Sequence, residues 1–106
     1  LPSEQATSLA LVINELVLNS LEHAFAGRKM GVVGVKIIKT SQAYQIEVYD
    51  DGVGLAAENI ETLTQNSLGL QIVRTLVETD LGGRFSLVNQ NGTRGIIVIP
   101  RIPKEV

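Results

Sequence analysis

The spacing of apolar residues predicts two helices. From about Ser3 to about Phe25, apolar residues recur every three or four positions, as they do on one face of an α-helix. The segment SLGLQIVRTLVETDL, residues 67–81, shows the same period and is followed by Gly82 and Gly83, which stop a helix. A serine is a favoured cap, so Ser3 is expected to cap the first helix.

Four segments rich in β-branched and aromatic residues predict strands. They are VVGVKIIK, YQIEVYD, RFSLVNQ and TRGIIVIPR, at residues 32–39, 44–50, 84–90 and 93–101. Ser41-Gln42 joins the first pair and Asn91-Gly92, a strong turn signal, joins the second, so each pair is expected to form an antiparallel hairpin. The segment 56–66 fits a short helix or a loop. Because both helices must cover one face of the sheet, the expected fold is α+β, a two-layer α/β sandwich.

The first helix carries a polar stripe. Glu15, Asn19 and His23 are four residues apart, so at about 100° per residue they lie almost along the helix axis. Apolar residues flank the stripe on both sides: Leu9, Val12, Ile13, Leu16 and Val17 on one, Leu11, Leu18, Leu21 and Phe25 on the other. This pattern predicts a partly buried slot, since a stripe facing solvent normally lies opposite a single apolar face. The polar groups there must be satisfied, either by neighbouring backbone or by a ligand.

Composition narrows the class of protein. The chain has 106 residues, no cysteine, one histidine and a formal net charge of -2. This length fits one domain, and the lack of cysteine excludes a disulfide framework or a thiolate metal site. The mild acidity argues against a nucleic-acid surface. No apolar run reaches the length of a membrane span, and the start, LPSEQATS, has no signal pattern, so we expect a cytoplasmic domain without direct membrane contact.

Three glycine-rich turns suggest a ligand site. In YDDGVGL, Asp50 can accept hydrogen bonds from a base, and Gly52 and Gly54 allow the backbone to approach a ligand closely. In NSLGLQIV, a helix start suits a phosphate, whereas the alternative is an ordinary helix capped by Ser67. In NGTRGIIVIP, the hydroxyl of Thr93 is spare. Each motif taken alone also fits a plain loop or hairpin turn.

In this order the four motifs resemble the ATP-binding catalytic domain of bacterial sensor histidine kinases. That domain belongs to the Bergerat-fold, or GHKL, superfamily, together with gyrase, Hsp90 and the MutL ATPases. The resemblance covers nearly the whole chain and is closest to the branch with an Asn-Glu-Leu motif, a short lid and an SLGL turn. It implies a mixed, mostly antiparallel sheet with helices on one face. It also implies that residues 1–106 form one domain without the upstream dimerisation and phosphoacceptor region.

The resemblance implies a role for each residue of the polar stripe. Asn19 matches the asparagine that coordinates Mg²⁺ with the phosphates of ATP, and oxygen ligands of this kind suit that ion. Glu15 matches the acid that orients a water or the attacking group, so Glu15 and Asn19 are the expected catalytic residues. His23 is expected to line the same slot near the phosphates.

The resemblance also assigns the nucleotide contacts. Asp50 matches the acid that receives the adenine amino group, with Thr93 supporting it through water, and Gly52 and Gly54 bring the backbone against base and ribose. Residues 56–65 match the lid over ATP. The turn that meets the phosphates is matched by Ser67, Leu68, Gly69 and Leu70.

Two departures from the family pattern concern the phosphates. Glu22 stands where most members have a lysine, three residues after the metal-binding asparagine. An acid there repels phosphate, so either Arg28 or Lys29 substitutes for the lysine or ATP binding is weak. The glycine turn also lacks the earlier glycines of the commoner pattern and has Gln65 and Ser67 instead.

The implied function is transfer of the γ-phosphoryl group from ATP to a histidine on a separate dimerisation domain, with a response regulator as an indirect partner. The only histidine of this chain, His23, lies in the binding motif, so the phosphoacceptor is expected elsewhere. Two alternatives remain open. Glu22 suggests a nucleotide-binding module without catalysis, and Glu15 suggests a GHKL ATPase or a serine kinase of the anti-sigma-factor type.

Overall fold

In a computed structural model of the chain, residues 1–24, 31–52, 67–89 and 92–101 are described. The helical elements are α1 (Ser3–Asn19), η1 (Ser20–Ala24), α3 (Leu68–Thr75) and η2 (Leu76–Asp80), where η marks a π-helical turn that directly continues an α-helix. The strands are β1 (Val33–Lys39), β2 (Ala43–Asp50), β3 (Arg84–Asn89) and β4 (Thr93–Pro100).

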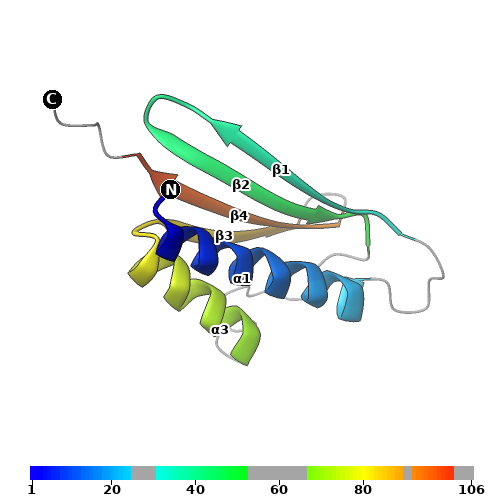
Figure 1. Cartoon of the computed structure of the whole chain (residues 1–106). Helices are drawn as coiled ribbons and strands as arrows, with labels where there is room; N and C mark the ends of the chain where they lie inside the picture. The colour runs from blue at the N-terminus through cyan, green and yellow to red at the C-terminus, as the bar shows by residue number, and fades with distance from the viewer. Residues whose placement is uncertain (25–30, 53–66, 90–91, 102–106) are drawn as a thin grey trace, which may run out of the picture.

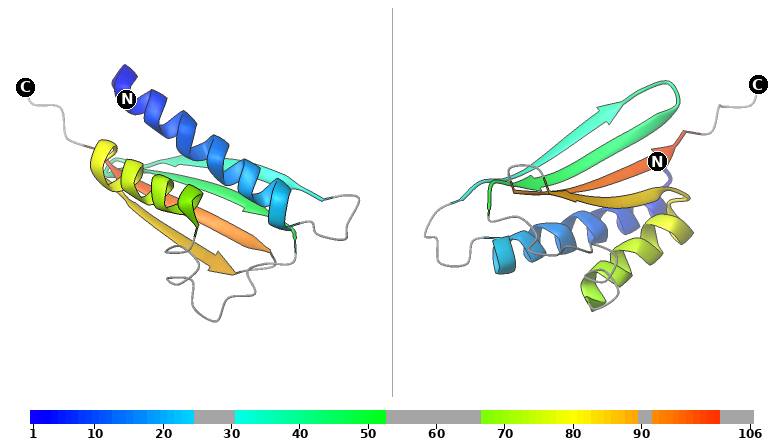
Figure 2. Two further views of the ribbon diagram at one scale, coloured as in Figure 1. Left: turned by 90° about the horizontal axis from the view of Figure 1, so that it is seen from below. Right: turned by 180° about the vertical axis from the view of Figure 1, so that it is seen from behind.

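The strands form one sheet in the order β1-β2-β4-β3, and every described pair is antiparallel. Both predicted hairpins are present, and the pairing of β2 with β4 joins them into one sheet. Helices α1 and α3 lie side by side on one face of this sheet (Figures 1 and 2). The predicted two-layer α+β sandwich is therefore confirmed.

The core lies between the helices and the inner face of the two central strands. Alternate residues of β4 are buried, from Thr93 to Ile99, which is the period of two expected of a strand with one covered face. Helix α1 contributes Val12 and Leu16 to this layer. The fully buried core side chains are Val12, Ile46, Leu70, Val73, Val77, Ile97 and Ile99.

A row of three isoleucines across the sheet allows the assigned core to be tested. Ile37, Ile46 and Ile97 are paired across β1, β2 and β4, but Ile97 is 0% exposed and Ile37 is 62% exposed. Ile97→Ala should lower the free energy of unfolding by about 2–5 kcal/mol, because it leaves a cavity in the core. Ile37→Ala, the matched control, should change it by no more than about 0.5 kcal/mol. Urea denaturation followed by circular dichroism measures both, and equal losses would contradict the assigned core.

The helix ends differ from the sequence-based expectations in two ways. Ser3 is not the cap of the first helix: Pro2 holds that position without a side-chain cap bond, and Ser3 is the first helical residue. The α-helical pattern also ends at Asn19, where the π-helical turn begins. A π-turn holds more residues per turn, so the spacing of 100° per residue does not extend to His23. Gly82, with φ of 63°, follows the second helix and stops it as predicted.

No helix within the described ranges combines the length and the hydropathy needed to cross a membrane.

Candidate functional site

A buried carboxylate lies where β2 ends. Asp50, the last residue of β2, is 5% exposed. Its Oδ1 accepts hydrogen bonds from the backbone N–H groups of Gly52 at 3.0 Å and Thr93 at 3.1 Å. Its Oδ2 accepts one from the hydroxyl of Ser20 at 2.8 Å. These bonds offset the cost of burying the carboxylate, and they join β2, β4 and the end of the first helix at one point.

The turn before β4 approaches this carboxylate closely. Gly92 has a φ of 121°, a backbone conformation that residues with a side chain rarely adopt. A Cβ at this position would overlap the backbone oxygen of Asp50 and would lie 3.0 Å from its Oδ1. Both the conformation and the lack of space therefore require glycine here, directly before Thr93.

A second acid of the first helix reaches the start of α3. A Cβ on Gly69 would collide with Oε1 of Glu15, so the carboxylate of Glu15 lies against this glycine. The hydroxyl of Ser67 accepts a hydrogen bond from the backbone N–H of Leu70 at 3.2 Å and caps α3. The first turn of a helix carries partial positive charge, which favours the nearby carboxylate. The interpretation of Ser67 as a helix cap is thus correct, and phosphate contacts by this turn stay a prediction.

Asn19 lies between these two contacts along the first helix. It is half-buried, one turn after Glu15 and directly before Ser20. The axial rise from residue 15 to residue 20 is roughly 7–8 Å. The helix therefore holds an acid beside α3, an amide, and a hydroxyl bonded to Asp50 within a short span.

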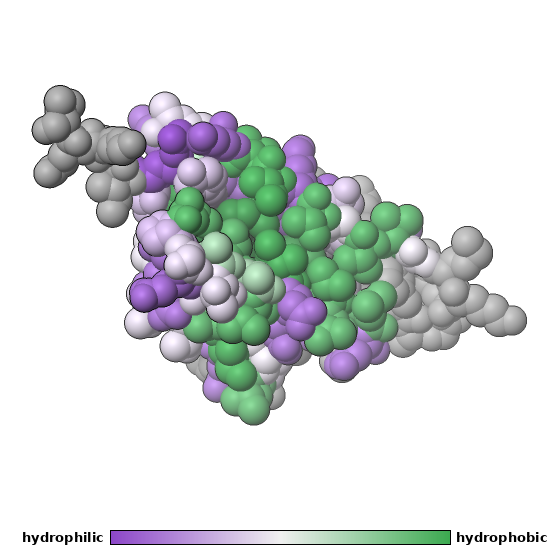
Figure 3. Space-filling view, viewed as in Figure 1, coloured by the Kyte–Doolittle hydropathy of each residue, from purple (hydrophilic) through white to green (hydrophobic). Residues whose placement is uncertain are grey.

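The second apolar flank of the polar stripe is not buried, contrary to expectation. Leu11, Leu18 and Leu21 are 55%, 42% and 56% exposed, whereas Val12 and Leu16 belong to the core. These leucines face away from the sheet, and the exposed apolar surface extends over α1 and α3 in Figure 3. Among the described residues, protein therefore covers the stripe on one side only.

Several predicted positions lie outside the described residues. They are Gly54, the lid at 56–65, Arg28, Lys29 and the side chain of His23. Of the predicted phosphate turn, Leu68 is exposed and Leu70 is buried in the core. Glu22 is exposed. The described ranges contain no group of three or more histidine, cysteine, aspartate or glutamate residues that could hold a metal ion.

Ser20 is a site residue that the sequence interpretation missed. A signal was present, because Ser20 follows Val12 and Leu16 at intervals of four, and such a column predicts a buried position. A buried hydroxyl needs a partner, which here is Asp50. Thr93 also differs in detail from the expectation: its backbone N–H contacts Asp50 directly.

Comparison with known proteins decides the family. Residues 4–105 match the family described as histidine kinase-, DNA gyrase B- and HSP90-like ATPase. The chain belongs to this ATPase family. Within the family, the chain is 39% identical over 104 residues to the sensor histidine kinase PdtaS of Mycobacterium tuberculosis, a match that covers 97% of this chain and 20% of PdtaS. It is 34% identical over 99 residues to the blue-light-activated histidine kinase 2 of Erythrobacter litoralis, covering 92% of this chain and 28% of that kinase.

Solved structures of this ATPase family have the same fold. The histidine kinase domain of the Erythrobacter litoralis EL346 blue-light-activated kinase matches with a TM-score of 0.82 and 34% identity, over 94% of this chain and 46% of that one. The catalytic domain of histidine kinase ThkA matches with a TM-score of 0.78 and 25% identity, over 92% of this chain and 69% of that one. The chain spans about a fifth of the length of PdtaS.

Proposed function

We propose that this domain binds Mg-ATP and transfers the γ-phosphoryl group to a histidine of a separate dimerisation domain in two-component signal transduction. Membership of the ATPase family and the likeness to sensor histidine kinases support this proposal. The observation that carries it is the buried Asp50 carboxylate, which is bonded to the residue following Asn19. A cytoplasmic location fits this function.

The base contact is assigned to Asp50. Its two oxygens accept from Ser20, Gly52 and Thr93, which fixes the orientation of the carboxylate before a ligand arrives. A fixed acceptor suits the exocyclic amino group of adenine, which is a hydrogen-bond donor. The close approach of Gly92 keeps side-chain atoms off this carboxylate. We assign Gly52 and Gly54 to the ribose side of the base.

The phosphate side is assigned to the first helix and the start of α3. The half-buried Asn19 offers a carboxamide oxygen, and Glu15 offers carboxylate oxygens one turn earlier. Oxygen donors of this kind fit Mg²⁺, which keeps several waters and binds phosphate oxygens as well. When bound, the ion supplies charge neutralisation at the phosphates. The backbone N–H groups of Ser67, Leu68 and Gly69, at the start of α3, are assigned to the phosphate oxygens, whereas the N–H of Leu70 donates to the hydroxyl of Ser67.

Phosphoryl transfer needs positioning more than covalent chemistry from the protein. A ring nitrogen of the acceptor histidine attacks the γ-phosphorus, the bond from phosphorus to the ADP oxygen breaks, and ADP leaves with that electron pair. Glu15 is assigned to orient the attacking group, since its carboxylate lies against the first turn of α3. The lid at 56–65 is assigned to exclude water from this reaction.

The transfer is tested with labelled ATP. The chain alone should acquire no stable label, because its only histidine, His23, lies in the binding motif. Adding the dimerisation domain of the full-length protein should place acid-labile label on that domain. Stable label on His23 would contradict the assignment, and label on a partner serine would favour a serine kinase of the anti-sigma-factor type.

Glu22 favours a second candidate, a nucleotide-binding module without catalysis. This exposed acid replaces a lysine at a position expected near the phosphates, and a negative charge there opposes their binding. Calorimetry with an ATP analogue and Mg²⁺ separates the two candidates. Binding by the chain, with no transfer by the full-length protein to its own histidine or to a response regulator, would favour the second.

Gly69→Ala tests the role assigned to Glu15. The new methyl group would occupy the position of the Glu15 carboxylate, and this flexible side chain must turn away. We expect the transfer rate to fall about 100-fold, as a small misplacement of a positioned group can cause. The fold should survive, since only the end of a side chain moves.

Glu15→Gln provides the comparison for this experiment. If both substitutions act through the same carboxylate, the double variant should transfer no more slowly than the slower single variant, which a double-mutant cycle measures. If the losses of transfer rate multiply in the double variant, Gly69 affects transfer independently of the Glu15 carboxylate.

A further inference from the structure

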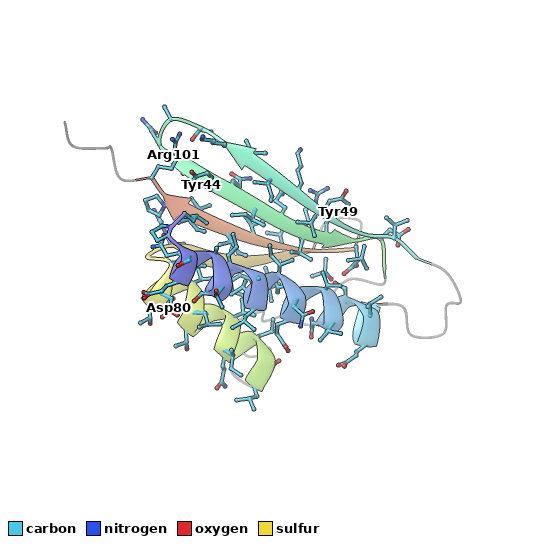
Figure 4. The ribbon with its side chains drawn as sticks, in the orientation of Figure 1. Tyr44, Tyr49, Asp80 and Arg101 are labelled. Carbon is cyan, nitrogen blue, oxygen red and sulfur yellow. The ribbon has the colours of Figure 1, made fainter. Side chains whose placement is uncertain are left out.

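A buried column with a serine at each end runs along α1 to the first residue of η1. The column is Ser8, Val12, Leu16 and Ser20, and both serines are 7% exposed. Each hydroxyl donates a hydrogen bond of 2.8 Å to the Oδ2 atom of an aspartate, Ser8 to Asp80 and Ser20 to Asp50. Asp80 lies beside the start of α1 (Figure 4), whereas Asp50 lies beside its end. The two bonds are equal in length, but only the second involves the proposed base contact.

The hydrogen-bond donors of the described residues around Asp50 leave one acceptor position of its carboxylate open. A carboxylate offers about four acceptor positions, two on each oxygen. The N–H groups of Gly52 and Thr93 fill both positions on Oδ1, and the Ser20 hydroxyl fills one on Oδ2. The donors of the described residues therefore leave a single acceptor position, on Oδ2, and its direction depends on the position that Ser20 occupies.

The backbone holds Ser20 in place. Its N–H lies within hydrogen-bonding reach of both the Leu16 and the Val17 carbonyl oxygens, at the junction of the α-helix and the π-helical turn. π-helical turns are frequent at functional sites. Ser20 is thus a buried, anchored donor rather than a mobile surface hydroxyl.

We propose that Ser20 is a positioning residue that directs the remaining acceptor of Asp50, and so makes the site select purines with an exocyclic amino group. This inference rests on the proposed function. Without the hydroxyl, Oδ2 has two open acceptor positions, and the carboxylate loses one of its three anchors. A site built to accept one hydrogen bond discriminates strongly against ligands that lack the donor. Losing the anchor weakens that discrimination.

The test compares two nucleotides that differ only at the purine 6-position. ATP carries the amino group, and purine riboside triphosphate carries hydrogen instead. For Ser20→Ala, calorimetry should show affinity for ATP reduced about tenfold, the size expected when one hydrogen bond to a charged group is disturbed, and affinity for the second nucleotide changed less than about twofold.

Ser8→Ala is the control: the serine has the same burial and the same bond length at the other end of the helix, and its partner Asp80 is exposed and lies outside the proposed site. Ser8→Ala should lower the melting temperature less than Ser20→Ala does, because water can reach the exposed Asp80 carboxylate, and it should leave the affinities for both nucleotides unchanged. Ser20→Cys replaces the hydroxyl by a slightly larger thiol that donates weakly, so its ATP affinity should lie between those of wild type and Ser20→Ala. This variant also decides the question if Ser20→Ala does not fold.

The experiment distinguishes failure of the role assigned to Ser20 from failure of the proposed function. Equal losses of affinity for the two nucleotides, or no loss for either, would overturn the role of Ser20 and leave the proposed function standing. Failure of the wild-type chain to bind either nucleotide would overturn the proposed function, and this inference with it.

Discussion

Asn19→Ala is expected to abolish the magnesium-dependent part of ATP binding and to leave the fold intact. Asn19 is half-buried, one turn after Glu15 and directly before Ser20, which is bonded to Asp50. Removing its carboxamide takes away the proposed protein ligand of Mg²⁺, which holds the ion against the phosphates. Alanine is the best helix former, so α1 should not be weakened by the change.

Calorimetric titrations of ATP with and without Mg²⁺ measure this effect. The wild-type affinity should rise when Mg²⁺ is added, and the affinity of Asn19→Ala should not. Asn14→Ala is the control, because it removes the same group from an exposed position of the same helix. An unchanged dependence on Mg²⁺ in the Asn19 variant would remove this residue from the metal site, and thermal melts followed by circular dichroism check the fold.

Asp50→Asn should reduce affinity for ATP by about 10- to 100-fold, the range expected for lost hydrogen bonds to a charged acceptor. The amide has nearly the same shape, but one oxygen becomes an NH₂ group. If that group faces the N–H groups of Gly52 and Thr93, it meets two donors. If it takes the place of Oδ2, the hydroxyl of Ser20 can turn and accept from it, but the adenine amino group of the proposed complex then meets a donor instead of an acceptor. Because Asp50 is buried, water cannot easily replace the lost bond.

This loss should be specific for the base. Binding of inorganic triphosphate with Mg²⁺, measured by calorimetry, should change less than binding of ATP, because the phosphates contact other residues in the proposed site. Asp51→Asn is the control: the next residue is exposed, and its Oδ1 accepts a bond from the N–H of Val32. Equal losses for ATP and triphosphate in the Asp50 variant would count against a role in recognising the base.

The sequence predicts the local elements better than their assembly. The hairpins follow from alternating residues and from the Asn91-Gly92 turn, which are signals within a few positions. Pairing of β2 with β4 joins residues such as Ile46 and Ile97, far apart in the chain, and no local pattern encodes it. The expectation that apolar residues on both sides of the polar stripe form a partly buried slot was wrong for a related reason. Helical period places Leu18 on a face but does not say whether another element covers that face.

At the site, the sequence predicts which residues carry chemistry but not how they are held. Asp50 was found from its glycine-rich turn, yet its contact with Ser20 joins residues 30 positions apart and needs the tertiary structure. The role of Thr93 was expected through its hydroxyl, whereas the backbone N–H makes the described contact. The cap at Ser3 was wrong because a serine near a helix start is only a preference, and here Pro2 precedes the first turn.

The central claim is that Asp50 holds the base while Asn19 holds the metal-bound phosphates. Two-dimensional NMR of the wild-type chain, titrated first with adenosine and then with an ATP analogue and Mg²⁺, tests it most directly. Adenosine should shift the backbone amide signals of Ser20, Gly52 and Thr93, and the side-chain amide of Asn19 should shift only when triphosphate and Mg²⁺ are both present. Saturable binding that leaves all four signals unchanged would contradict the account.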